Sequence, residues 1–131
     1  MHLKAFMEKI LLSSHIYKCT IEFLNDGSDK MPDIKITILR TLDPIEVFGD
    51  EFPFKEPAAT CSYFEEGQEF ISENTERPEG FGCTWAWHDL YKQVIFLYFG
   101  GVYYKGDPNV AITCCSDGKR PVIFKLERIE E

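Results

Sequence analysis

The sequence predicts a small α+β domain in which a mostly antiparallel sheet packs on one long helix. Three observations predict this class. Residues 34–39 and 69–72 have the β-branched and aromatic content of strands, residues 85–99 follow a helical pattern, and an Asp-Gly turn joins two apolar runs near the C-terminus. Hydrophobic residues make up 44% of the 131 residues, which is enough for a core that needs no disulfide or metal.

The first 30 residues stand apart from this pattern. Met31 lies directly ahead of the first clear strand, Ile34 to Leu39, and residues 16–23 are also strand-like. Residues 16–23 could form a hairpin with that strand, or residues 1–30 could be a non-native or disordered N-terminal extension. We favour the extension, which gives a single α+β domain over residues 31–131.

The middle of the chain predicts one short helix, one strand and the long helix. Asp43-Pro44 should begin a helix over Ile45 to Phe48, and Glu69 to Ser72 should be a strand. Thr84 is the predicted N-cap of the long helix Trp85 to Phe99, which Gly100-Gly101 should end. The apolar surface of this helix is wide, so we expect the helix to be mostly buried against the sheet. Four residues share its most apolar face: Ala86, Leu90, Val94 and Leu97.

The C-terminal segment predicts a hairpin with strands over Val110 to Cys115 and Val122 to Ile129. Strand alternation sends Cys114 and Cys115 to opposite faces, and we expect Cys114 to face the core. Val122, Phe124 and Leu126 should also face the core. In the turn, Asp117 and Arg120 could pair with each other, or Arg120 could bind an anion at the sheet edge.

Charge is unevenly distributed along the chain. The net charge is −8, and residues 43–79 hold eleven acids against two bases. This acidic band argues against nucleic-acid binding, which needs a basic face, and it suits a solvated surface, a basic protein partner or a cation.

No apolar run reaches about 18 residues and no signal peptide is recognisable, so we expect no membrane span and a cytoplasmic location. The sequence does not decide whether the protein has a protein partner or forms a homo-oligomer.

Four of the five cysteines follow residue 60: Cys61, Cys83, Cys114 and Cys115. In a reducing compartment such thiols are candidate metal ligands or reactive groups. Because the hairpin cysteines diverge, we expect only one of them to join Cys61 and Cys83 around a metal. Zinc or another thiophilic metal is the candidate ligand, although the spacing is unlike that of zinc ribbons or iron–sulfur motifs.

Cys83 is the candidate catalytic residue if the protein is an enzyme. It directly precedes the predicted N-cap, where backbone N–H groups and the helix dipole favour a thiolate, and His88 follows about one turn later. The alternative is a half-buried cysteine that packs under Trp87.

Several motifs together resemble a known family. They are Cys61-x-x-Phe64-x-x-Gly67-Gln68, Pro78-Glu79-Gly80-Phe81, Cys83-x-x-Ala86-Trp87, and Cys114-x-x-Asp117-Gly118-x-Arg120-Pro121-Val122-Ile123-Phe124-x-Leu126. Residues 33–131 thereby resemble a family of small conserved hypothetical proteins, found largely in anaerobic bacteria and archaea, that has no assigned activity. The resemblance implies that Cys61, Cys83 and one of the hairpin cysteines belong to the family motif, and that Met31 is the natural start. Ser62, where proline is expected, and the inserted Gly82 depart from the pattern.

Three functional hypotheses follow from these residues. The favoured one is thiol-based binding of a metal or cofactor through the clustered cysteines. The second is an interaction module whose cysteines are simply buried. The third is a thiol-dependent redox enzyme or accessory protein with Cys83 as nucleophile. The sequence favours a protein that is not an enzyme, because no paired acid and base and no phosphate-binding loop accompany the thiols.

Overall fold

The computed structural model describes residues 30–129. The predictions for residues 1–30 concern a segment that lies almost wholly outside this range, so they stay predictions. No helix in the described range is long and apolar enough to cross a membrane.

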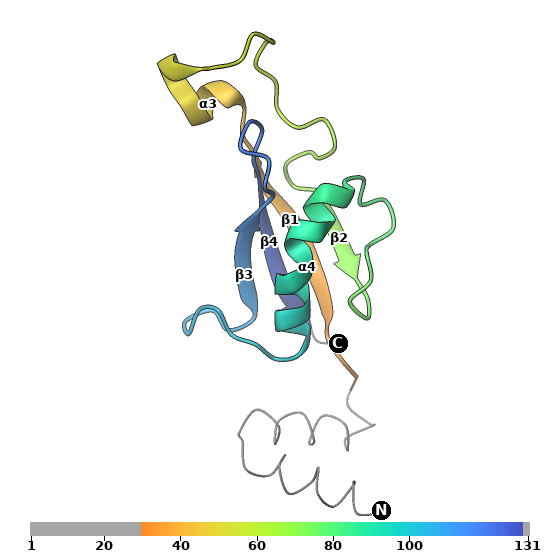
Figure 1. Cartoon of the computed structure of the whole chain (residues 1–131). Helices are drawn as coiled ribbons and strands as arrows, with labels where there is room; N and C mark the ends of the chain where they lie inside the picture. Colours follow the sequence, from red (N-terminus) through yellow and green to blue (C-terminus); the bar gives the residue numbers. More distant parts are fainter. Residues whose placement is uncertain (1–29, 130–131) are drawn as a thin grey trace, which may run out of the picture. The chain divides into compact units, whose positions relative to one another are not determined.

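The predicted α+β class is confirmed, with a short helix in addition to the long one (Figure 1). Along the chain the elements are β1 (Asp33–Thr41), α3 (Pro44–Phe48), the 3-10 turn η1 (Gly49–Glu51), β2 (Glu69–Ser72), α4 (Thr84–Tyr98), β3 (Val110–Cys114) and β4 (Val122–Ile129). The predicted start of α3 is also confirmed, because Asp43 caps it by accepting a hydrogen bond from the Glu46 N–H at 2.9 Å.

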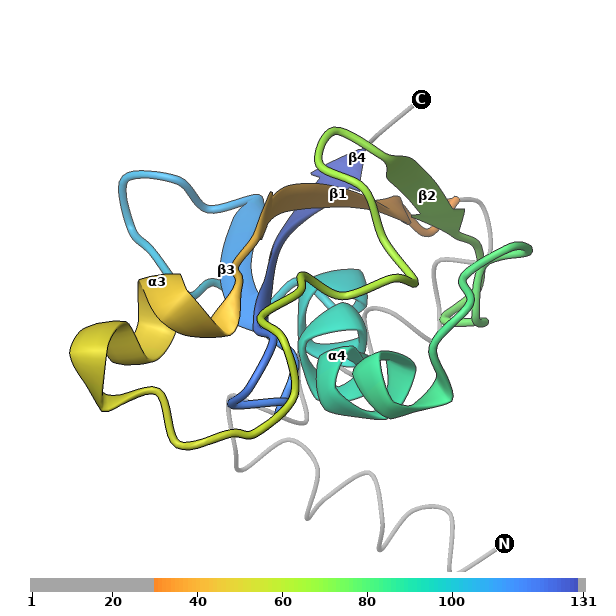
Figure 2. The ribbon, with the colours of Figure 1, turned by 90° about the horizontal axis from the view of Figure 1, so that it is seen from above.

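The four strands form one antiparallel sheet in the order β2-β1-β4-β3. Helix α4 covers one face of this sheet (Figure 2). Between them lies the core, which is built from alternate residues of the two central strands and one stripe of the helix. The main members are Ile34, Ile36 and Ile38 of β1, Val122, Phe124 and Leu126 of β4, and Ala86, Leu90, Val94 and Leu97 of α4, all at most 1% exposed.

The other face of the sheet carries charged side chains. Lys35 of β1 lies 3.7 Å from the Glu127 carboxylate of β4 and 3.9 Å from that of Glu69 of β2. These cross-strand pairs occupy the positions that alternate with the core isoleucines. The outer face is therefore mixed, because Ile71 and Ile112 lie on it beside the charged side chains and are 40% and 44% exposed.

Helix α4 confirms the predicted buried stripe but corrects two expectations. Its N-cap is Cys83 and not Thr84, which is the first helical residue. The helix is also not mostly buried, because only its sheet-facing side is covered, and Trp85 is 69% exposed. The predicted glycine ending is confirmed: Gly100 has a φ of 89° and the Gly101 N–H donates to the Phe96 carbonyl at 2.7 Å.

Strand β3 overturns the predicted facing of the two hairpin cysteines. Ala111 pairs with Leu126 and Thr113 with Phe124, so these residues share the core face. Cys114 pairs with Ile123 on the opposite face and is exposed, whereas Cys115 packs against the core. The expectation failed because it treated the larger Ile112 as the core residue, whereas the small Ala111 faces the core, only 2% exposed, and Ile112 is 44% exposed.

Candidate functional site

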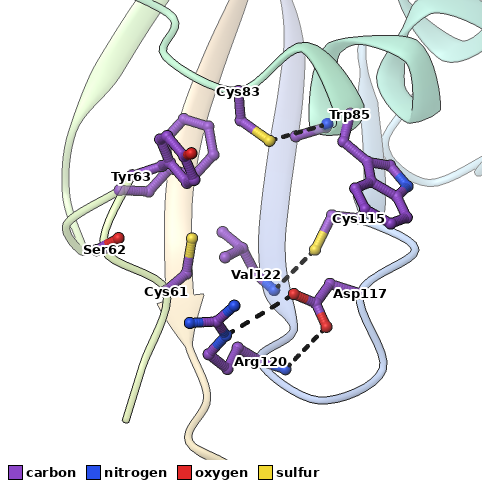
Figure 3. A pocket seen from close by; sticks show the side chains of 11 residues that line it. Cys61, Ser62, Tyr63, Cys83, Trp85, Cys115, Asp117, Arg120 and Val122 are labelled. Carbon is purple, nitrogen blue, oxygen red and sulfur yellow. Dashed lines mark hydrogen bonds and ion pairs between the residues drawn. The ribbon is translucent and has the colours of Figure 1, made fainter.

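Three of the four described cysteines line one pocket of about 430 Å³, which we call the thiol pocket (Figure 3). Cys61, Cys83 and Cys115 lie on three sides of it and Arg120 on a fourth. All described cysteines are free thiols. The remaining lining residues are Ser62, Tyr63, Phe64, Trp85, Ala86, Asp117 and Val122.

The loops that bring Cys61 and Cys83 to the pocket are each anchored by a nearby phenylalanine. Phe64 follows Cys61 by three residues and Phe81 precedes Cys83 by two, and both rings are buried, 4.9 Å apart between centroids. Phe64 also packs edge-on against Phe124 of β4 at 5.4 Å. Two irregular segments are thus fixed on the core, and each presents its cysteine beside that anchor.

Cys83 is positioned by its role as the cap of α4. Its sulfur accepts a hydrogen bond from the Ala86 N–H at 3.3 Å, in place of the oxygen of a usual capping residue. The segment before it is held by Arg77, which donates to the Phe81 carbonyl at 2.9 Å and to the Thr84 hydroxyl at 2.8 Å. His88, expected near Cys83, does not line this pocket and lies in a groove beside Cys114. A nucleophilic role for Cys83 stays a prediction.

Cys115 reaches the pocket from the end of β3. Its N–H donates to the Val122 carbonyl at 3.2 Å, and the Val122 N–H donates to its sulfur at 3.4 Å. Burial raises the pKa of the Cys115 thiol, the Asp117 carboxylate adds to the rise, and the backbone hydrogen bonds partly oppose it. Because metals bind the thiolate, a metal at this sulfur would have to displace a firmly held proton.

Cys114 lines a different cavity, which we call the polar groove. The groove also measures about 430 Å³, and Cys115 lines it as well as the thiol pocket. The residues around it are His88, Asp89, Lys92, Gln93, Thr113, Cys114, Cys115 and Ser116. Of the two hairpin cysteines, the structure therefore brings Cys115, and not Cys114, together with Cys61 and Cys83.

The hairpin turn supplies the charged wall of the thiol pocket. Asp117 Oδ1 accepts hydrogen bonds from the backbone N–H groups of Lys119 at 2.9 Å and Arg120 at 3.3 Å, which folds the turn. The other carboxylate oxygen, Oδ2, lies 3.9 Å from Arg120 Nε. The predicted Asp117–Arg120 pair is thus present, as a contact longer than a hydrogen bond.

The predicted metal-binding set is not preformed. Within residues 30–129, no group of three or more His, Cys, Asp or Glu side chains is arranged to hold a metal ion. The thiols share a cavity, but its volume is that of a small-molecule site, about 300–1,000 Å³, and not that of a single ion. The arrangement can surround a ligand of several atoms with soft sulfur donors.

The sequence analysis does not predict two aromatic residues that line the pocket. Tyr63 and Trp85 flank the pocket and are 62% and 69% exposed. Each follows a pocket cysteine by two residues, in Cys61-Ser62-Tyr63 and Cys83-Thr84-Trp85. This shared spacing was the available signal. The Trp85 indole N–H donates to the Ser116 hydroxyl at 2.7 Å, which joins the start of α4 to the hairpin turn.

No family model, curated protein or solved structure matches this chain. The resemblance to a family of small hypothetical proteins therefore stays a prediction.

Proposed function

We propose that this protein binds a small cofactor that carries a thiophilic metal, in the pocket lined by Cys61, Cys83 and Cys115. The observation that carries the proposal is the convergence of three free thiols, from segments 61–64, 83–86 and 115–122, on one cavity. Thiolates are the preferred ligands of zinc, copper(I) and iron–sulfur centres. Thiols kept free also suit a reducing cytoplasm.

The size of the pocket supports a cofactor over a bare ion. A single zinc ion needs sulfurs about 2.3 Å away on convergent vectors, and no such set is preformed in the described part of the chain. A cluster or a metal complex of several atoms would fill more of the 430 Å³ and could reach all three sulfurs at once. We expect binding to release protons, including the one that burial retains on Cys115.

The test is to purify the protein without oxygen, record its absorption spectrum and measure its metal content. We expect a stoichiometric thiophilic metal in the wild type, strongly reduced in C61S, C83S and C115S. Serine is a suitable replacement because it caps a helix well at position 83 and can accept the Val122 hydrogen bond at position 115.

Cys114 provides the matched control for that experiment. It is adjacent to Cys115 but lines the polar groove, so C114S should retain the metal in full. Wild-type protein that carries neither a metal nor a chromophore after anaerobic purification would overturn the proposal. Equal loss in C114S and C115S would also overturn it, because the pocket would then not be what holds the metal.

A second candidate function is an interaction module, and the exposed aromatic rim of the pocket favours it. Tyr63 and Trp85 are more exposed than the other large hydrophobic residues of the described chain. Aromatic side chains of this kind often dominate binding to a protein partner or a second copy of the chain. Light scattering of wild type and W85A at several concentrations tests self-association; a wild type that is monomeric throughout contradicts a homo-oligomer.

A further inference from the structure

Arg120 differs from the other arginines in the described part of the chain. Arg40 donates to Glu66, Arg77 to the Phe81 carbonyl and Thr84, and Arg128 to several carbonyls and Asn109. The Arg120 guanidinium makes no hydrogen bond to any residue in 30–129, and its Nε is buried without a hydrogen-bond partner there. A buried donor without an acceptor is costly, so such a group normally has a partner.

Asp117 does not complete the hydrogen bonding of this guanidinium. Its Oδ1 is engaged by two backbone N–H groups of the turn, and its Oδ2 is 3.9 Å from Arg120 Nε. That distance permits charge attraction but exceeds the roughly 2.7–3.2 Å of an N–H···O hydrogen bond. The Arg120 side chain is 43% exposed, and its two terminal nitrogens have no hydrogen-bond partner in residues 30–129, so they stay available on the pocket side for two parallel hydrogen bonds to an oxyanion.

The rest of the pocket wall has no fixed cation that could replace Arg120. Among its lining residues, Asp117 is the only acidic and Arg120 the only basic residue. In Figure 3 the guanidinium lies at one end of the pocket, below Cys61 and Cys115, and Cys83 lies at the other end. The pocket thus offers a ligand both thiol sulfurs and a guanidinium.

We propose that the ligand of this pocket carries an oxyanion group, a carboxylate or a phosphate, that binds the Arg120 guanidinium while its thiophilic part meets the cysteines. This inference rests on the proposed function, because it names the chemical class of the cofactor for the same site. It assigns Arg120 a binding role that the turn alone does not require.

Thiol alkylation tests the inference without any metal. Iodoacetate and iodoacetamide are similar in size and reactivity, but only iodoacetate carries a carboxylate. The rate of each reagent is measured at each cysteine by peptide mass spectrometry, and the iodoacetate-to-iodoacetamide ratio is taken. This ratio cancels the thiolate fraction of the cysteine itself. Cys114 serves as internal reference, since it lines the polar groove, whose lining does not include Arg120.

We expect the ratio at Cys61 and Cys115 to exceed that at Cys114 by about fivefold, the factor that a unit charge pair about 4 Å apart gains even in water. R120Q should bring it to the Cys114 value or below, because Asp117 then remains as the only charged lining residue, and R120K should leave an intermediate value. D117N should raise it, because asparagine keeps the acceptor of the turn but removes the competing charge. Circular dichroism confirms that each variant is folded.

Equal ratios at the three cysteines of the wild type would overturn the inference, whatever the variants do. A raised ratio that R120Q leaves unchanged would overturn it as well. These outcomes are distinct from failure of the proposed function, which is decided by the metal content of the anaerobic protein and not by alkylation.

Discussion

The thiol pocket and the polar groove have about the same volume and share Cys115 in their linings, yet they are different kinds of cavity. Cys114 lines only the groove. The thiol pocket is built on buried aromatic anchors and three thiols from distant segments. The groove is lined mainly by polar side chains of α4 and the end of the hairpin. The two cavities therefore differ in the side chains that line them and not in volume.

The largest expected effect tests whether the two cavity walls contribute differently to the stability of the fold. F64A removes a buried ring that packs against Phe81 and Phe124, and it should lower the free energy of unfolding by about 3–5 kcal/mol. H88A removes an exposed ring from the groove and should change it by less than about 0.5 kcal/mol. Urea unfolding curves measure both. Similar losses in the two variants would show that the walls are equally tied to the core.

A smaller effect is expected where the two cavities meet. Asp89 of α4 accepts a hydrogen bond from the Ser116 backbone N–H at 2.7 Å, which fastens the hairpin turn to the helix. D89A should cost about 0.5–1.5 kcal/mol, and D89N, which keeps an acceptor oxygen, should cost less. The same unfolding measurement applies. If the two variants lose equal stability, this hydrogen bond does not fasten the turn.

The smallest effect concerns the protonation of the adjacent cysteines. The pKa of Cys115 is raised in the folded protein, so the unfolded chain releases this proton first. The resulting stabilisation is complete below the ordinary thiol pKa of about 8.5 and is lost as the pH rises toward the folded value. The free energy of unfolding, measured with reductant between about pH 7.5 and 9.5, should thus fall less in C115S than in wild type. C114S should behave as wild type; the reverse result would mean that Cys114 holds the shifted proton.

Much of the fold follows from local patterns that the sequence displays. Alternation in β1 and β4 identifies their core residues, and the stripe Ala86, Leu90, Val94 and Leu97 identifies the buried face of α4. The helix start was misplaced by one residue, because a thiol is an unusual capping acceptor and Thr84 is a common one. The exposure of Trp85 was also missed, since a helix that covers one side of a single sheet has an uncovered outer side.

The candidate site was predictable in part. That Cys61 and Cys83 would be joined by only one hairpin cysteine was an expectation from alternation, and one pocket does contain Cys61, Cys83 and Cys115. Whether they bind a metal stays a proposal. Tyr63 and Trp85 were not predicted, because the spacing that they share after Cys61 and Cys83 does not by itself say that both aromatic side chains reach the pocket. The buried anchors of the two segments, Phe64 and Phe81, contact each other in the core.

The sequence by itself determined that Cys114 and Cys115 point to opposite faces, because the two-residue period of a strand is a local property of the backbone. Only the tertiary structure decided which of them meets the other thiols. The hairpin register sets Ala111 opposite Leu126 and Cys114 opposite Ile123, and α4 covers the face that Ala111 shares. Which of the two alternating sets of side chains faces the core depends on which face of the sheet is covered. Contacts between segments far apart in the chain decide which face is covered.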